Sequence, residues 1–255
     1  MRDDHGELYG YLGIAQDLTE RKKLDRIKSE FISTVSHELS TPLTSIRAVL
    51  GLMDAGAMDP AKAKEMISIA HRNSERLVKI TNDILDVEKI EFGKIALHPD
   101  PLKVEPFIRH SLEANQTYGD KYHVRFVQKE IPEGLKVMAD PDRLMQILAN
   151  LLSNAAKFSY PDSEVWVEAE GREDRIYFSV RDFGSGIPRD FHSRVFEKFA
   201  QANTTNVRDH GGSGLGLSIT KLLVEAMGGS IRFESQVGAG TTFFFDLPQP
   251  STEQP

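Results

Sequence analysis

The chain of 255 residues contains no cysteine, which excludes disulfide bonds and cysteine-ligated metal sites from its design. No run of about 18 apolar residues is present, and the N-terminus lacks the apolar segment of a signal peptide. Acidic residues outnumber basic ones by 38 to 31, and this net charge of −7 argues against nucleic acid as a partner, because phosphate binding needs a basic surface. We therefore expect a soluble, cytoplasmic chain without membrane contact, whose 40% hydrophobic content is enough for packed cores.

The strongest pattern in the sequence is an apolar stripe near the N-terminus. Apolar residues recur there three or four positions apart, as on one face of a long amphipathic helix: Leu24, Ile27, Phe31, Val35, Leu39, Leu43, Ile46, Leu50 and Met53. His37 lies two residues from both Val35 and Leu39, about 200° around such a helix, so it faces away from the stripe. Taken alone, this position fits an ordinary exposed surface histidine.

The residues around His37 suit phosphoryl transfer. A neutral imidazole nitrogen is a competent nucleophile near neutral pH, and the adjacent carboxylate of Glu38 can orient the ring and accept its proton. Pro42 cannot donate a hydrogen bond to the carbonyl of Glu38, so we expect the helix to bend just after His37. The string SHELSTPLTSI resembles the phosphoacceptor box of sensor histidine kinases, with Ser40 where that family usually has arginine. The resemblance implies that His37 accepts phosphate and that Thr41 positions water for dephosphorylating a partner.

A second long helix is predicted for residues 60–92, after the turn AGAMDP, with Asp59 as its cap and Pro60 at its first position. Its apolar face carries Met66, Ala70, Leu77, Ile80, Ile84 and Val87. Two such helices cannot bury their faces alone, so we predict that residues 18–93 form an all-α antiparallel hairpin that pairs as a homodimer into a four-helix bundle. A coiled-coil spacer would show the same periodicity.

After this hairpin the pattern changes to short strands alternating with helices. It indicates an α+β sandwich, with helices on one face of a mixed sheet, over residues 94–248. Strands are predicted at residues 95–97, 125–128, 136–139, 164–170, 175–181, 230–235 and 241–247. Helices are predicted at residues 104–118, 141–157 and 216–227. The tail, residues 249–255, is expected to be disordered.

One of these helices carries polar residues on a face above its core face. Asn150, Asn154 and Lys157 follow the spacing i, i+4, i+7, and amide oxygens can coordinate Mg²⁺ while an ammonium group can meet phosphate. A merely solvated face would more usually carry Glu and Lys. The string from Gln146 to Phe158 resembles the N box of the histidine-kinase ATP domain. That resemblance implies Mg²⁺ on Asn154 and the triphosphate of ATP near Asn150 and Lys157, with Phe158 where the family often has tyrosine.

Two glycine-rich segments complete the expected nucleotide site. Glycines in DFGSGIP allow the backbone to approach a base closely, and GGSGLGLSI runs into a helix whose N-terminus favours phosphate. Both resemble glycine boxes of the same family, and FHSRVFEKFAQA between them resembles its F box. The resemblance implies that the Asp182 carboxylate accepts a hydrogen bond from the adenine amino group. It also implies nucleotide contacts from Gly184, Gly186, Ile187, Phe199, Gly212, Ser213, Gly214, Leu215, Gly216 and Leu217.

Two details of this site are left open by the motifs. Residues 203–210 are expected to form a mobile lid over the nucleotide. Gln201 stands where some family members carry a basic residue near the phosphates, so any cationic help there must come from elsewhere. Lys198 and Arg208 are the candidates.

The motifs occur in the order typical of sensor histidine kinases, with a HisKA-type phosphoacceptor hairpin followed by a GHKL-type (Bergerat) ATP domain. This resemblance implies ATP- and Mg²⁺-dependent phosphorylation of His37 and transfer to an aspartate of a response-regulator receiver domain, together with phosphatase activity toward that regulator. Residues 1–17 resemble the last strand and exit of a PAS sensor, which implies a remnant of a preceding domain. A simple tail leading into the helix fits them equally.

Two other classes of protein remain open. The ATP domain also resembles that of the Hsp90, gyrase and MutL ATPases, which act as conformational clamps, but these need a transducer domain and a catalytic water that are not evident here. A nucleotide-binding, non-enzymatic signalling scaffold is the second alternative. The intact pair His37–Glu38 and the intact Asn154 argue against it.

Overall fold

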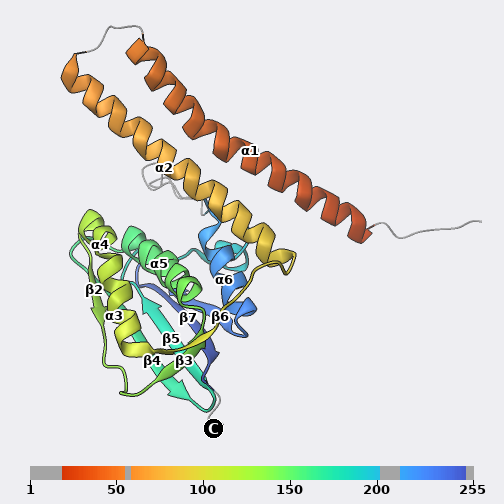
Figure 1. Ribbon diagram of the computed structural model, residues 1–255, viewed down its shortest axis with the longest axis vertical. Helices are drawn as coiled ribbons and strands as arrows, with labels where there is room; N and C mark the ends of the chain where they lie inside the picture. Colours follow the sequence, from red (N-terminus) through yellow and green to blue (C-terminus); the bar gives the residue numbers. More distant parts are fainter. Residues whose placement is uncertain (1–18, 55–58, 202–212, 251–255) are drawn as a thin grey trace, which may run out of the picture.

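The computed structural model describes residues 19–54, 59–201 and 213–250 (Figure 1). The predictions for residues 1–17, for the lid at 203–210 and for residues 251–255 lie outside these ranges. The expected disorder of the tail is wrong for its first residue, because the backbone N–H of Gln249 donates to the carbonyl of Asp174 at 2.7 Å.

The N-terminal part is an antiparallel hairpin of two long helices, called here the helical hairpin: α1 (Thr19–Asp54) and α2 (Pro60–Glu91) (Figure 1). The second helix was predicted within one residue of its bounds. Pro42 lies inside α1, which continues through it. Pro60 begins α2 and Asp59 is its N-cap residue, as predicted, although the side chain of Asp59 makes no capping hydrogen bond.

The remaining residues form the sheet domain, which contains a five-stranded sheet in the order β2-β4-β5-β7-β6. Its strands are β2 (Arg125–Gln128), β4 (Glu164–Arg172), β5 (Arg175–Arg181), β6 (Ser230–Gln236) and β7 (Gly240–Pro248). β2 pairs in parallel with β4 and the other pairs are antiparallel, so the sheet is mixed as predicted. A separate antiparallel pair joins β1 (Asp100–Lys103) to β3 (Lys136–Ala139).

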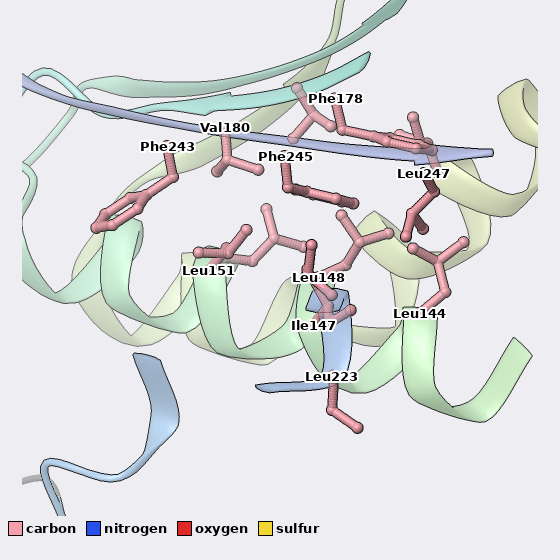
Figure 2. Close-up of a cluster of buried hydrophobic side chains, with 14 of the residues drawn as sticks. Leu144, Ile147, Leu148, Leu151, Phe178, Val180, Leu223, Phe243, Phe245 and Leu247 are labelled. Carbon is pink, nitrogen blue, oxygen red and sulfur yellow. The ribbon is translucent and has the colours of Figure 1, made fainter. Parts of the chain in front are cut away.

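Helices cover one face of this sheet: α3 (Val104–Ala114), α4 (Gln116–Tyr122), α5 (Pro141–Phe158) and α6 (Gly216–Ala226) (Figure 1). The core lies between α5 and the two central strands, where Leu144, Leu148 and Leu151 of α5 point at the sheet (Figure 2). Phe178 of β5 and Phe245 of β7 stack there with ring centroids 4.6 Å apart. This packing fixes α5, and with it the polar residues along its other side.

Two predictions in the sheet domain are wrong. Residues 95–97 form no strand, and pairing starts only at Asp100, although Ile95 and Leu97 do pack against the core. The helix predicted for 104–118 is broken at Asn115 into α3 and α4. Asn115 has φ −101° and ψ 5°, and its side-chain amide and its backbone N–H both donate to the carbonyl of Ser111, at 2.8 Å and 3.2 Å.

No helix among the residues that the structure describes is both long enough and apolar enough to cross a membrane.

Candidate functional site

A cavity of about 220 Å³ opens in the sheet domain beside α5. Its walls come from α5, the segment after β5, the 3₁₀ helix Arg189–Arg194, the loop before α6 and the start of β7. Its apolar part is formed by Ile187, Pro188, Phe191, Val195, Leu217 and Phe243. A mostly apolar pocket with a few convergent polar groups is the usual form of a small-molecule site.

A buried carboxylate, that of Asp182, lines this cavity. Asp182 follows β5 directly and is 5% exposed, and its Oδ1 accepts from the backbone N–H groups of Gly184 at 3.0 Å and Thr241 at 3.2 Å. Burial raises the pKa of Asp182 to about 6, and the two N–H donors oppose that rise. Both hydrogen bonds use Oδ1, so Oδ2 is left to accept from a ligand N–H.

Two glycines allow the chain beside Asp182 to pass close to its neighbours. A Cβ on Gly184 would lie 1.9 Å from the carbonyl oxygen of Phe158, so Gly184 packs under the cavity rather than lining it. Gly186 has φ +68°, and a Cβ there would lie 2.2 Å from the carbonyl oxygen of Gln236. Gly186 and Ile187 do line the cavity, as predicted from the motif.

Three polar residues of α5 also line the cavity, and the part that they line is called here its polar end. Asn150, Asn154 and Lys157 of α5 line it together with Phe158, so the structure brings the predicted face together. Asn150 Nδ2 also donates to the carbonyl of Gly216 at 3.4 Å. Burial lowers the pKa of Lys157 to about 8, with neighbouring positive charges adding to the effect.

The loop leading into α6 closes this polar end. Ser213, Gly214, Gly216 and Leu217 line the cavity, and Gly214 has φ +70° with a virtual Cβ only 2.7 Å from the backbone of Phe199. Phe199 N donates to the carbonyl of Gly214 at 2.9 Å, so Phe199 supports the loop from behind.

Besides Gly184, two described residues of the predicted nucleotide set do not line the cavity. Leu215 is completely buried, and it does not line the cavity. Phe199 is likewise absent from the cavity wall, because it packs against the core. Gly212 lies outside the described residues.

His37 is exposed on α1, on the side of the helix away from α2 contacts, as predicted. Its neighbour Glu38 accepts from Arg76 of α2 through Oε2 at 2.9 Å, and the hydroxyl of Thr41 donates to the carbonyl of His37 at 3.1 Å. No described residue of α1 lines the cavity, and α2 lies between α1 and the sheet domain (Figure 1). The structure therefore does not bring His37 and the cavity together in this arrangement.

The cavity also includes residues that the sequence did not indicate. Thr241 and Ser153 line it from β7 and α5, and Lys79 lines it from α2. Lys79 could not be found from motifs, because its position depends on how the helical hairpin packs against the sheet domain. Ser153 follows Asn150 by three residues, so helical spacing alone could have included it.

The donors at the polar end fit a metal ion held mainly by a nucleotide. The described residues contain no group of three or more His, Cys, Asp or Glu side chains that could hold a metal. Asn154 offers an amide oxygen, and Mg²⁺ commonly takes only one or two protein ligands and fills its shell with phosphates and water. The residues present therefore suit a Mg²⁺–nucleotide complex and not a protein-enclosed ion.

Comparison with known proteins matches both parts of the chain. Residues 27–93 match the family described as "His Kinase A (phospho-acceptor) domain". Residues 139–251 match the family described as "Histidine kinase-, DNA gyrase B-, and HSP90-like ATPase".

Curated relatives carry both regions in one chain. The circadian input-output histidine kinase CikA of Synechococcus elongatus is 36% identical over 98% of this chain and 36% of its own length. The sensor histidine kinase WalK of Bacillus subtilis is 32% identical over 100% of this chain and 42% of its own length. The chain thus spans less than half the length of these two relatives.

Solved structures share the arrangement of elements. The structure of histidine kinase ThkA in complex with response regulator protein TrrA has a TM-score of 0.71 at 26% identity, covering 92% of this chain and 66% of that one. Full-length ShkA in complex with AMPPNP has a TM-score of 0.66 at 28% identity, covering 89% of this chain and 47% of that one. The helical hairpin, the cavity of the sheet domain and these matches agree, and the chain belongs to the sensor histidine kinases of two-component systems.

Proposed function

We propose that this chain uses ATP and Mg²⁺ to phosphorylate itself on His37 and then passes the phosphoryl group to an aspartate of a response regulator. One observation carries the proposal. The same chain joins an exposed His37, followed by a half-buried Glu38, to a cavity lined by a buried carboxylate and by amide and ammonium groups. The likeness to CikA, WalK and the AMPPNP-bound ShkA supports it.

The cavity suits ATP in one orientation. Asp182 Oδ2 accepts from the adenine amino group, since Oδ1 is already held by two backbone donors. Asn150 and Lys157 then face the triphosphate. Asn154 supplies an amide oxygen to Mg²⁺, and the metal, when bound, neutralises charge on the phosphates.

The transfer step follows from the chemistry of imidazole. The unprotonated ring nitrogen of His37 attacks the γ-phosphorus, the bond to the bridging oxygen breaks, and ADP leaves. Glu38 holds the other ring N–H and accepts its proton; the ion pair with Arg76 uses Oε2, which leaves Oε1 for the imidazole. Because α2 separates α1 from the sheet domain here, transfer within one chain requires the sheet domain to reorient on the hairpin, with the boundary near Gly93 as the hinge.

The helical hairpin is proposed to dimerise into a four-helix bundle. In one chain α1 leaves Ile32, Leu43 and Leu50 exposed by 54%, 59% and 57%, and α2 leaves Ile67, Val78 and Leu85 exposed by 53%, 58% and 44%. Within each helix these residues are spaced eleven and seven positions apart, so they lie on one line along the helix. An apolar line on both helices of one hairpin is the surface that a second hairpin would cover.

The response regulator is proposed as the second partner, and the complex of ThkA with TrrA supports it. The exposed hydroxyl of Thr41, one turn after His37, is available to position a water that hydrolyses the aspartyl phosphate of the regulator and releases inorganic phosphate, so we also propose phosphatase activity toward the phosphorylated regulator. These reactions consume cellular ATP, which places them in the cytoplasm.

The proposal is tested by incubating the chain with γ-labelled ATP and Mg²⁺ beside two variants, His37→Gln and His71→Gln. His71 is an exposed histidine of α2, so its variant controls for the loss of an accessible imidazole on the same hairpin. We expect acid-labile, base-stable label on the wild type and on His71→Gln, and none on His37→Gln. ATP consumed without label on the protein would instead indicate a clamp-type ATPase, and ATP bound but neither consumed nor transferred would indicate a scaffold.

A further inference from the structure

One residue at the polar end of the cavity comes from outside the sheet domain. Lys79 of α2 lines the cavity together with Asn150, Asn154 and Lys157 of α5. Within the described residues, the ammonium group of Lys79 forms no hydrogen bond or ion pair. A flexible lysine that lines a ligand cavity without a protein partner is available to an anionic ligand.

Polar contacts hold α2 in the position that brings Lys79 to the cavity. Ser213 donates to Asp83 Oδ2 at 3.0 Å, which ties the loop before α6 to α2. Gln146 of α5 donates to Asp86 Oδ2 at 2.8 Å. Lys79, Asp83 and Asp86 are spaced four and three residues apart, so they share the face of α2 that meets the sheet domain.

Positive charge accumulates at this end of the cavity. The charges of Lys79 and Arg76, after burial, help to lower the pKa of Lys157 to about 8. Holding like charges together is unfavourable unless an anion shares the site. Burial raises the pKa of Asp83, one turn along the same face of α2, and both the hydrogen bond from Ser213 and the charge of Lys79 oppose that rise.

Gln201 stands where a basic residue would be expected near the phosphates, and Lys198, one of the two candidates to replace it, is bound to a carboxylate of α2. The ammonium group of Lys198 lies 2.5 Å from Glu91 of α2, and Arg208 lies outside the described residues. Lys79 of the helical hairpin lines the same cavity as Gln201 and can supply the missing positive charge.

We propose that Lys79 binds the terminal phosphates of ATP, so that α2 of the helical hairpin completes the nucleotide site of the sheet domain. The inference rests on the proposed nucleotide cavity and adds a residue from the phosphoacceptor hairpin to it. Since Lys79 reaches the cavity only when the two parts are docked, ATP binding and docking stabilise each other. A nucleotide without terminal phosphates gains nothing from Lys79.

Binding is measured by isothermal titration calorimetry with ATP, ADP and AMP, in the presence of Mg²⁺ and in a His37→Gln background that cannot transfer phosphate. Lys79→Ala is compared with Lys64→Ala, which removes the same charge from an exposed position nearer the start of α2. A charge-assisted phosphate contact predicts that Lys79→Ala weakens ATP binding by about tenfold and leaves AMP binding unchanged. Lys64→Ala should match the background, and Lys79→Arg should restore most of the affinity for ATP.

A variant that loosens α2 from the sheet domain distinguishes a direct contact between Lys79 and ATP from a general effect of its positive charge. Asp86→Ala removes a tether that does not line the cavity, so it should lower ATP affinity toward the level of Lys79→Ala, and the double variant should lose little more. Equal ATP affinity in Lys79→Ala and Lys64→Ala would overturn this inference while leaving the proposed function intact. Failure of the background protein to bind ATP at all would overturn both.

Discussion

Substitution of Asp182 is expected to change the free energy of unfolding and the binding of adenine in opposite directions. Its carboxyl is 5% exposed, and burial raises its pKa from 3.8 to about 6. Each unit of pKa corresponds to about 1.4 kcal/mol, so ionised Asp182 costs the folded protein about 3 kcal/mol relative to the unfolded chain. Because the pKa of Asp182 is higher in the folded than in the unfolded state, its contribution to stability is largest below about pH 4 and is lost as the pH rises through about 6.

Asp182→Asn removes this titration and keeps an oxygen that can accept from Gly184 and Thr241. The free energy of unfolding of the variant minus that of the wild type should therefore increase by about 3 kcal/mol between about pH 4 and pH 7. Any effect of the amide on stability that does not depend on pH cancels in this comparison. The same substitution should abolish adenine binding. With the amide oxygen at the position of Oδ1, an NH2 group takes the place of Oδ2, and it cannot accept a hydrogen bond from the adenine amino group.

The assay is urea unfolding followed by the fluorescence of Trp166, the single tryptophan of the chain, which lies in β4 and so reports on the sheet domain. Its ring lies 4.6 Å from that of Phe183, next to Asp182. The exposed Asp174→Asn controls for removing one negative charge from the same domain. Parallel stability curves for Asp182→Asn and the wild type across this pH range would refute the reasoning.

Three further predictions concern the loop, the dimer and the phosphatase. Gly186→Ala should destabilise the sheet domain by at least about 2 kcal/mol more than Gly238→Ala in urea unfolding, because both glycines have positive φ but only Gly186 lies against a backbone carbonyl; equal losses would contradict this. Leu43→Ser removes a 59%-exposed leucine from each chain, so the dissociation constant of the dimer should rise about 100-fold in sedimentation equilibrium. Val237→Ser, at a 64%-exposed turn residue, should leave that constant unchanged. Thr41→Ala should lose dephosphorylation of the regulator while keeping autophosphorylation; unchanged dephosphorylation would rule out its proposed role.

The sequence predicted best what depends on local chemistry. The spacing of Asn150, Asn154 and Lys157 placed three ligand groups on one helical face, and the cavity lies on that face. The apolar alternation of residues 175–181 likewise predicted β5 with its bounds. Each of these depends on residues close together in the chain.

The failures depend on contacts between distant segments. The break at Asn115 is accompanied by a buried side-chain hydrogen bond to the carbonyl of Ser111, which helix propensity does not reveal. Leu43 and Leu50 belong to the predicted stripe, yet they are exposed in one chain because the stripe is wider than the contact with α2. Lys79 joins the cavity only through the packing of two parts whose relative position no sequence motif encodes.

The central claim is that nucleotide held in the cavity phosphorylates His37, and locating the phosphate tests it most directly. The chain is incubated with Mg²⁺ and ATP, digested at neutral to alkaline pH and analysed by mass spectrometry, beside Asn154→Ala as a variant of the cavity. The account predicts one phosphoryl group on the peptide that contains His37, and none in Asn154→Ala. Phosphate on any other residue, or phosphorylation of His37 that persists in Asn154→Ala, would contradict it.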